Sequence, residues 1–211
     1  MPIRHYRERT LETEVTCDRC TLEYSVFGVF AFCPDCREHN SLSILRRNLA
    51  LVRKQVALAA TLTDSALQQH IIEDAYENCV SALDGFGREA CRVRRHVSSD
   101  AAEAESISFQ NLDGASTKLK TLFAASLADE VGEDDWSLLV RGFMRRHLLV
   151  HRSGVVDQRY LTETGESSTL LGRRISIDGA QTTMLADAVE RLGETLIRIL
   201  PATTNSTTER S

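Results

Sequence analysis

The pattern of apolar and polar positions changes near Ser41. Before that point a β-prone run with Gly28 at a predicted turn is carried by Tyr24, Val26, Phe30 and Phe32. After it, apolar residues recur every three or four positions, which is the period of helices. We therefore predict a mainly α protein: a small β module over residues 1–40, and an all-α bundle over residues 41–200.

Two apolar stripes open the predicted bundle. The first begins at about Ser41 and contains Leu42, Leu45, Leu49, Val52 and Val56. Asp64 is placed to cap a second, longer helix. Its stripe runs through Leu67, Ile71, Ala75, Cys79, Leu83, Phe86, Ala90, Val93 and Val97. Gly85 and Gly87 are expected to loosen or bend this helix, and the single cysteines Cys79 and Cys91 are expected to be buried thiols.

The second half of the chain predicts a linker and three further helices. Residues 98–114 read as the linker, with an extended piece at 107–109. A third helix carries Leu119, Leu122, Phe123 and Leu127, and a fourth spans about 134–153. A turn-rich segment at 154–179 precedes the last helix, whose apolar residues are Met184, Leu185, Val189, Leu192, Leu196 and Ile199. Residues 201–211 are polar and predicted to be a mobile tail.

The β module contains the sequence's strongest chemical signal. Two C-x2-C pairs are separated by twelve residues, and their members are Cys17, Cys20, Cys33 and Cys36. Each pair has the spacing of a tight knuckle, and two knuckles supply the four thiolates of a tetrahedral Zn²⁺ site. We predict a zinc ribbon with one structural zinc per chain; a disulfide framework is the weaker alternative. His39 lies nearby and is expected to be a bystander.

The fourth predicted helix carries an unusual number of cations. On a helical wheel its core face comprises Trp136, Leu139, Val140, Phe143 and Val150, and Leu138 and Leu149 form a second apolar strip. Two apolar strips are expected of a helix at the centre of a bundle or in a dimer interface. Arg141, Arg145 and Arg152 group on the opposite, solvated side. Arg146 and His151 flank the core stripe, and His147 falls within it.

Each of these three residues also has an ordinary structural explanation. His147 could be a core histidine hydrogen-bonded to a neighbour. His151 could stabilise the negative C-terminal end of the helix dipole. Arg146 could cover apolar surface with its aliphatic stem. His147 and His151 are four residues apart and could grip a metal, but they lack a third ligand nearby.

Taken together, Arg146-His147-Leu148-Leu149-Val150-His151 resembles the R-x(4–6)-H signature of the HEPN superfamily, in which a polar residue follows the arginine. The helix order over about 41–200 and the segment 154–161 are similar to that superfamily as well. Two departures stand beside the resemblance. The polar residue is His147, where asparagine or aspartate is more usual. The spacing also fits Arg145 with His151 and Arg141 with His147.

The resemblance implies a metal-independent endoribonuclease with Arg146 and His151 as catalytic residues and His147 orienting them. RNA cleavage by the 2′-hydroxyl needs proton transfer, which histidine performs near neutral pH, and a cation on the phosphorane. One His151 does not easily fill both proton roles, so the resemblance implies a composite site in a homodimer formed by the helical domain. Arg141, Arg145 and Arg152 are tentative RNA-binding residues. The implied context is a defence, toxin or stress-response system.

Composition narrows the alternatives. The net charge is −5, so a broad basic surface for nucleic acid is excluded and a polyanion must bind a local patch. Of 25 cationic residues only three are lysines, which leaves 22 arginines. The chain lacks an apolar run of membrane-spanning length and an N-terminal apolar segment, so we expect a cytoplasmic protein.

The zinc ribbon could hold RNA through Tyr24, Phe27 or Arg37, or dock a regulatory protein. The rival function is a non-catalytic dimeric adaptor; a zinc-ribbon transcription regulator has less support.

Overall fold

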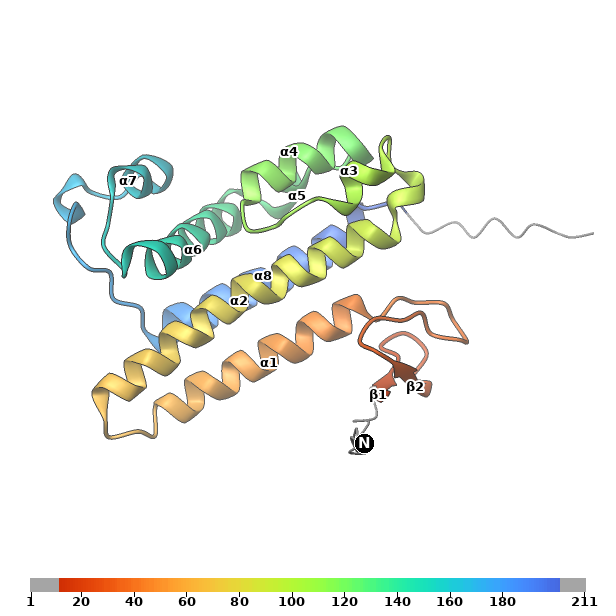
Figure 1. Cartoon of the computed structure of the whole chain (residues 1–211), viewed down its shortest axis with the longest axis horizontal. Helices are drawn as coiled ribbons and strands as arrows, with labels where there is room; N and C mark the ends of the chain where they lie inside the picture. The colour runs from red at the N-terminus through yellow and green to blue at the C-terminus, as the bar shows by residue number, and fades with distance from the viewer. Residues whose placement is uncertain (1–11, 202–211) are drawn as a thin grey trace, which may run out of the picture. The chain divides into compact units, whose positions relative to one another are not determined.

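The computed structural model describes residues 12–201, and it confirms a mainly helical protein with a small two-stranded sheet near the N-terminus (Figure 1). The chain divides into two compact units, and the boundary between Ile44 and Leu45 lies in the first turns of helix α1. The predicted tail at 201–211 lies outside the described residues except for Pro201, and the segment 1–11 lies outside them as well.

The N-terminal unit is built on an antiparallel hairpin. Strand β1 (Glu12–Thr16) pairs with β2 (Glu23–Phe27), and Val15 is buried opposite Tyr24. The sequence predicted the second strand but not the first, whose ETEVT composition is mostly polar. β2 ends at Phe27, where Gly28 turns the chain with a φ of +107°, as the sequence predicted. Asn40 then fastens the loop: its side chain donates to the carbonyl of Val29 and accepts from the amide of Ala31, each at 2.9 Å.

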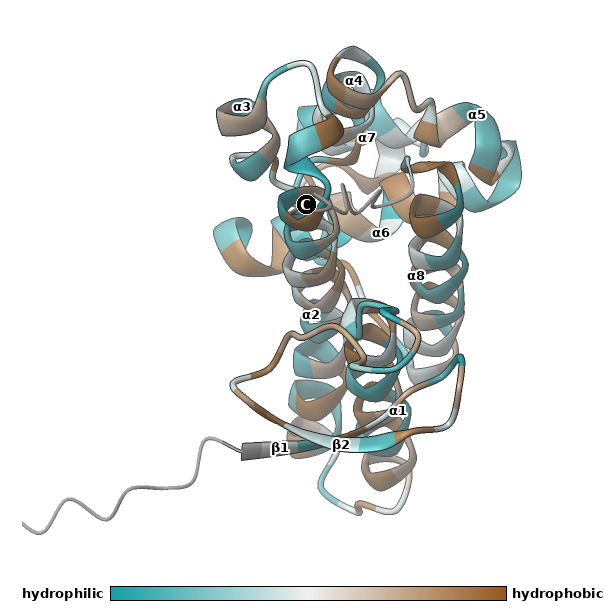
Figure 2. Cartoon of the chain, turned by 90° about the vertical axis from the view of Figure 1, so that its right-hand side faces the viewer, coloured by the Kyte–Doolittle hydropathy of each residue, from teal (hydrophilic) through white to brown (hydrophobic). Residues whose placement is uncertain are grey.

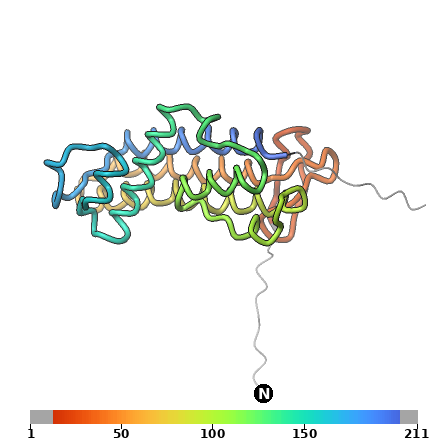
Figure 3. The backbone as a smooth tube through the Cα atoms, turned by 90° about the horizontal axis from the view of Figure 1, so that it is seen from above, coloured from red at the N-terminus to blue at the C-terminus, as the bar shows by residue number. Residues whose placement is uncertain are grey.

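The helical unit is a bundle of four long helices joined by shorter ones. The long helices are α1 (Ser41–Ala59), α2 (Ser65–Val93), α6 (Glu133–Arg152) and α8 (Gly179–Ile199). The shorter elements are η1 (Arg95–Val97), α3 (Ala101–Glu105), α4 (Leu112–Phe123), α5 (Leu127–Val131), α7 (Gln158–Thr164) and η2 (Ser168–Leu170). Seen from above, α1, α2 and α8 run side by side (Figure 3). Hydrophobic and hydrophilic residues alternate along these helices (Figure 2).

Local signals explain where the long helices begin. The Asp64 carboxylate accepts from the amides of Ala66 and Leu67, which confirms the predicted cap of α2. At the start of α8, Asp178 and Gln181 form a reciprocal capping box. The buried stripes of α2 and α8 face each other, and their buried members include Ile72, Tyr76, Leu83, Leu185, Val189, Leu192 and Leu196.

Ion pairs show how the long helices are oriented. Arg53 of α1 reaches Asp187 and Glu190 of α8 at 2.7 and 2.8 Å. Arg46, nearer the start of α1, reaches Glu194, which lies farther along α8. Asp135 at the start of α6 receives two hydrogen bonds from Arg191 of α8, at 2.7 and 2.6 Å, and Gly142 farther along α6 lies beside Leu185. α1 and α6 therefore run antiparallel to α8. Such half-exposed pairs fix register more than they add stability.

The connection between α2 and α4 differs from the prediction. The segment expected to be a linker contains α3. Its expected extended piece at 107–109 forms no strand, and Ile107 and Phe109 are fully buried. The buried carboxylate of Asp84 holds this turn, because it accepts from the Phe109 amide at 2.6 Å and the Ser108 hydroxyl at 3.1 Å. Phe109 lies against the backbone of α2, and a Cβ added at Gly87 would meet its ring at 2.4 Å. Gly87 therefore allows a close approach, where the sequence suggested a bend.

Two further boundaries differ. The predicted third helix is broken into α4 and α5, because Ala124 adopts a left-handed conformation with a φ of 54°. The turn-rich segment after α6 contains α7, which Asp157 caps by accepting from the amide of Tyr160. Among the helices of residues 12–201, none combines the length and the apolar character needed to cross a bilayer.

Candidate functional site

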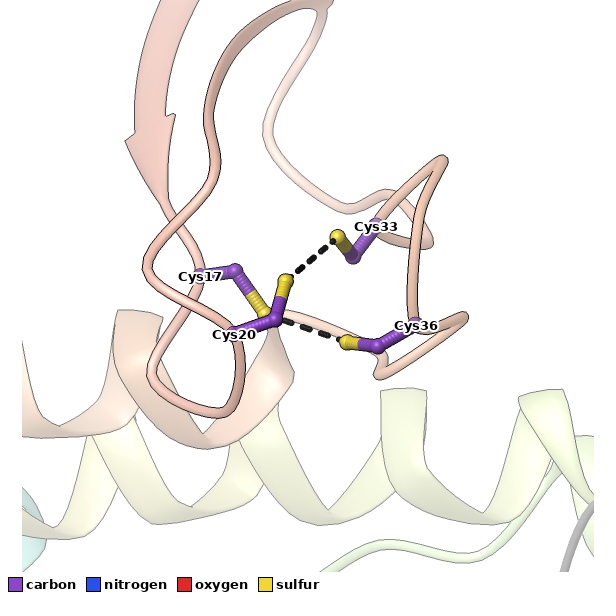
Figure 4. A group of neighbouring side chains, drawn as sticks. All are labelled: Cys17, Cys20, Cys33 and Cys36. Atoms are coloured by element: carbon purple, nitrogen blue, oxygen red, sulfur yellow. Dashed lines mark hydrogen bonds between the residues drawn. The ribbon is translucent and has the colours of Figure 1, made fainter.

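The four cysteines of the N-terminal unit lie together, as predicted (Figure 4). Their Sγ atoms are all within 4.8 Å of one another, and the closest pairs are Cys17–Cys36 at 3.4 Å and Cys20–Cys33 at 3.5 Å. A tetrahedral ion with metal–sulfur bonds of about 2.3 Å places its sulfurs roughly 3.8 Å apart. The cluster could therefore hold one metal ion with little rearrangement.

The two C-x2-C pairs fold into the same backbone turn. In the first turn the amide of Thr21 donates to the carbonyl of Cys17 at 2.9 Å; in the second, the amide of Arg37 donates to Cys33 at 3.0 Å. Thr21 and Arg37, each four residues after the first cysteine of its pair, have φ values of 62° and 61°. Such left-handed residues cost energy when they are not glycine, so the module holds a strained geometry that aims four thiols at one point.

Electrostatics explain why a cation suits this cluster. Burial raises the pKa of Cys33, but hydrogen bonds from the amides of Cys36 and Asp35 outweigh it and lower the pKa to about 7. The amide of Leu22 lowers the pKa of Cys20, but burial and the neighbouring thiols raise it to about 12. Four crowded thiols cannot all ionise without a positive charge between them. His39 is not in the cluster; its ring packs edge-on against Phe32, with centroids 4.8 Å apart.

The second candidate site is the C-terminal half of α6. Its helix ends as predicted: Ser153 is left-handed, and the amides of Ser153 and Gly154 both bond to the carbonyl of Leu148. The buried face of α6 differs from the core face that the helical wheel predicted. Leu139, Phe143 and Leu148 are buried, whereas Val150 is 41% exposed. The strip of Leu138 and Leu149 is half-buried.

Arg146, His147 and His151 lie on successive turns of this helix end. The rings of His147 and His151 are 4.8 Å apart between centroids. Burial, then the charge of His151, lowers the pKa of His147, so its neutral form dominates at pH 7. His151 is exposed. The Nε–H of Arg146 is buried, and it has no hydrogen-bond partner among residues 12–201.

Glu77 of α2 belongs to the same neighbourhood and was missed by the sequence reasoning. Burial raises the pKa of its carboxyl, and the positive charges of Arg146 and His151 oppose that rise. Glu77 stands on a helix that the sequence described only by its apolar stripe, and its approach to α6 is a tertiary contact. The periodicity of apolar positions therefore gives no signal that would identify Glu77.

The three arginines expected on the solvated face do not share one environment. Arg145 is largely buried, at 18% exposure: it donates to the Tyr160 hydroxyl at 3.1 Å and to Glu166 at 3.2 Å. Arg141 also pairs with Glu166, at 3.3 Å. Only Arg152 is well exposed, and it lies 3.5 Å from Asp157. The prediction that Arg145 lies on the solvated face was therefore wrong. α7 covers that face of α6, and Tyr160 is fully buried against it.

Beside His147 the surface forms a pocket of about 220 Å³ between α6, α7 and the start of α4. Val140, Phe143 and Met144 supply its apolar wall, and His147, Arg159 and Glu163 are among its polar lining. The sequence analysis gave neither Arg159 nor Glu163 a role in a site, because it interpreted their segment as turns. Comparisons of the chain with protein-family models, curated proteins and solved structures find no match.

Proposed function

We propose that this protein is a metal-independent endoribonuclease of the HEPN type, acting in a defence, toxin or stress-response system. The observation that carries the proposal is the cluster of Arg146, His147 and His151 at the accessible end of α6, beside Glu77. It combines the exposed imidazole of His151, for proton transfer, with the neighbouring guanidinium of Arg146, for the phosphate. These are the groups that cleavage by a 2′-hydroxyl requires.

Each residue has a defined role in the proposal. Arg146 binds the phosphate and stabilises the phosphorane with its planar donors. His151, which is exposed, moves the proton of the 2′-hydroxyl or of the leaving 5′-oxygen. His147 orients this pair and, being neutral at pH 7, can accept a hydrogen bond. Arg152 and, more weakly, Arg141 and Arg145 support RNA binding, since the latter two already share Glu166.

A homodimer through the helical unit supplies the second histidine. Val150 and Val155 stand on either side of His151 and are each 41% exposed. Contact between these valines and their copies would bring two α6 ends, with two His151 side chains, to one cleft. The sequence analysis based this interface on Leu138 and Leu149. Because these leucines are half-buried, the proposed interface rests on the exposed valines.

For the cysteine cluster we propose one structural Zn²⁺ per chain. Four sulfur ligands in paired knuckles are the donor set of structural zinc, and they leave no open position for catalysis. The ion would stabilise four neighbouring thiolates and offset the strain at Thr21 and Arg37.

A non-catalytic adaptor is the second candidate, and one observation favours it. The loop after β2 leaves several apolar side chains exposed: Phe27 at 87%, Val29 at 51% and Phe32 at 47%. Exposed aromatic residues of this kind suit a protein or RNA partner. In this alternative the protein dimerises and binds that partner without cleaving RNA.

The test compares variants of the full-length protein on a pool of RNAs in the presence of EDTA. His151→Ala is expected to slow cleavage by about 10²–10⁴-fold. Arg146→Ala is expected to do the same, and Arg146→Lys to restore little, because the planar fork is lost. The matched control is His96→Ala, an exposed histidine on η1, which should cleave at the wild-type rate. Equal rates for His151→Ala and wild type would refute the assignment and favour the adaptor.

A further inference from the structure

The pocket beside His147 has the dimensions and lining of a site for one planar ring. Its volume is about 220 Å³, below the range of about 300–1,000 Å³ typical of sites for drug-sized ligands. One wall is apolar, from Phe143 and Met144 of α6, and His147 stands on the same helix. A heteroaromatic ring could pack its face on this wall, as single-stranded bases do on apolar and aromatic side chains.

Three charged residues complete the lining: Arg159 and Glu163 of α7, and Asp113 in the first turn of α4. Arg159 and Glu163 are one turn apart on α7 and both face the pocket. Within the described part of the chain neither makes an ion pair or hydrogen bond through its side chain, and they do not pair with each other, although this spacing commonly allows it. The site thus presents a fork of donors and a pair of acceptor oxygens to one ligand.

The pocket is held in place by buried contacts. The wall from α4 begins at Asn111, which caps that helix by accepting from the amide of Gly114 at 3.1 Å. The preceding turn is fixed by Asp84 through the amide of Phe109. On the other side, Tyr160 anchors α7 to α6 with its buried ring and its hydroxyl bonded to Arg145. The charged pair is therefore carried by a helix with a fixed register.

We infer that this pocket binds a guanine base of the RNA next to the scissile phosphate. A carboxylate that accepts two hydrogen bonds needs two adjacent N–H donors, which among the four bases only guanine offers, at N1 and N2. An arginine fork needs two adjacent acceptors, and guanine presents O6 and N7. Glu163 and Arg159 match these two edges. The inference rests on the proposed function, because only a site that cleaves RNA has a scissile phosphate. The base pocket itself can be tested by nucleotide binding alone.

The experiment titrates GMP, AMP, CMP and UMP separately into the full-length protein and follows binding by calorimetry. GMP is expected to bind at least about tenfold more tightly than the others, as one good bidentate contact discriminates by that order. Glu163→Gln should remove this preference, since an amide offers one acceptor in place of two. Glu133→Gln, an exposed acid at the other end of α6, is the matched control and should keep it.

The outcomes separate the pocket from the nuclease. Preferential GMP binding that Glu163→Gln abolishes supports the pocket, even if RNA is never cleaved and the proposed function fails. Equal binding of all four nucleotides, or no binding at millimolar concentration, overturns the pocket, even if RNA is cleaved. A GMP preference that survives in both Glu163→Gln and Arg159→Ala also overturns it.

Discussion

At the scale of single residues, spacing in the sequence located the four clustered cysteines but not all of the candidate site on α6. Four cysteines in two knuckles meet because each C-x2-C turn is local, and its geometry depends on a few neighbouring residues. Arg146, His147 and His151 were also identifiable, since they share one helix. Glu77, Arg159 and Glu163 come from α2 and α7, and only packing brings them to the site.

The cysteine cluster gives the prediction that belongs to this scale. We expect about one zinc per chain in the purified protein and almost none in Cys17→Ser, because three thiolates hold the ion far less tightly. The N-terminal unit should then lose its protection from proteolysis while the helical unit keeps its far-UV circular dichroism. Cys79→Ser is the control: this thiol is buried in α2, outside the cluster, and burial raises its pKa to about 12. Wild-type zinc content in Cys17→Ser would contradict the assignment.

At the scale of elements, the long helices could be predicted and the short ones could not. α1, α2, α6 and α8 carry apolar stripes over many turns, and α2 and α8 also begin at local caps, Asp64 and Asp178. α3 and α7 span five and seven residues, too few for a period to show. The face of Arg145 was wrong for a related reason. A wheel separates polar from apolar residues, but it does not tell which polar side chain a neighbouring helix will cover.

Two glycines of α2 offer a matched test of this packing. Gly85 has open space where a Cβ would stand, so Gly85→Ala should raise the free energy of unfolding by about 0.5–1 kcal/mol through helix propensity. Gly87→Ala gains the same propensity but drives a methyl into the ring of Phe109, and should lower the free energy of unfolding by about 1–3 kcal/mol. Urea denaturation followed by circular dichroism measures both. Equal stabilisation by the two changes would show that Phe109 does not lie against Gly87.

At the scale of the whole molecule, the proposed function depends on the exposure of the C-terminal end of α6. α7 and its flanking loop cover one side of α6, α2 lies along another, and Val150, His151 and Val155 stay exposed at and just after its C-terminal end. The acidic net charge is no obstacle, because phosphate would be bound at a local group of arginines. Two copies that meet at this end would each contribute a histidine and an arginine.

The most direct measurement fractionates the full-length protein by size with light scattering and assays each fraction on RNA and DNA pools with EDTA. We expect cleavage of RNA alone, in the fractions whose mass is that of a dimer. The products should carry 2′,3′-cyclic phosphate and 5′-hydroxyl ends, because the 2′-hydroxyl is the nucleophile and DNA lacks it. RNA that stays intact in every fraction, or activity that elutes with the monomer, would contradict the account.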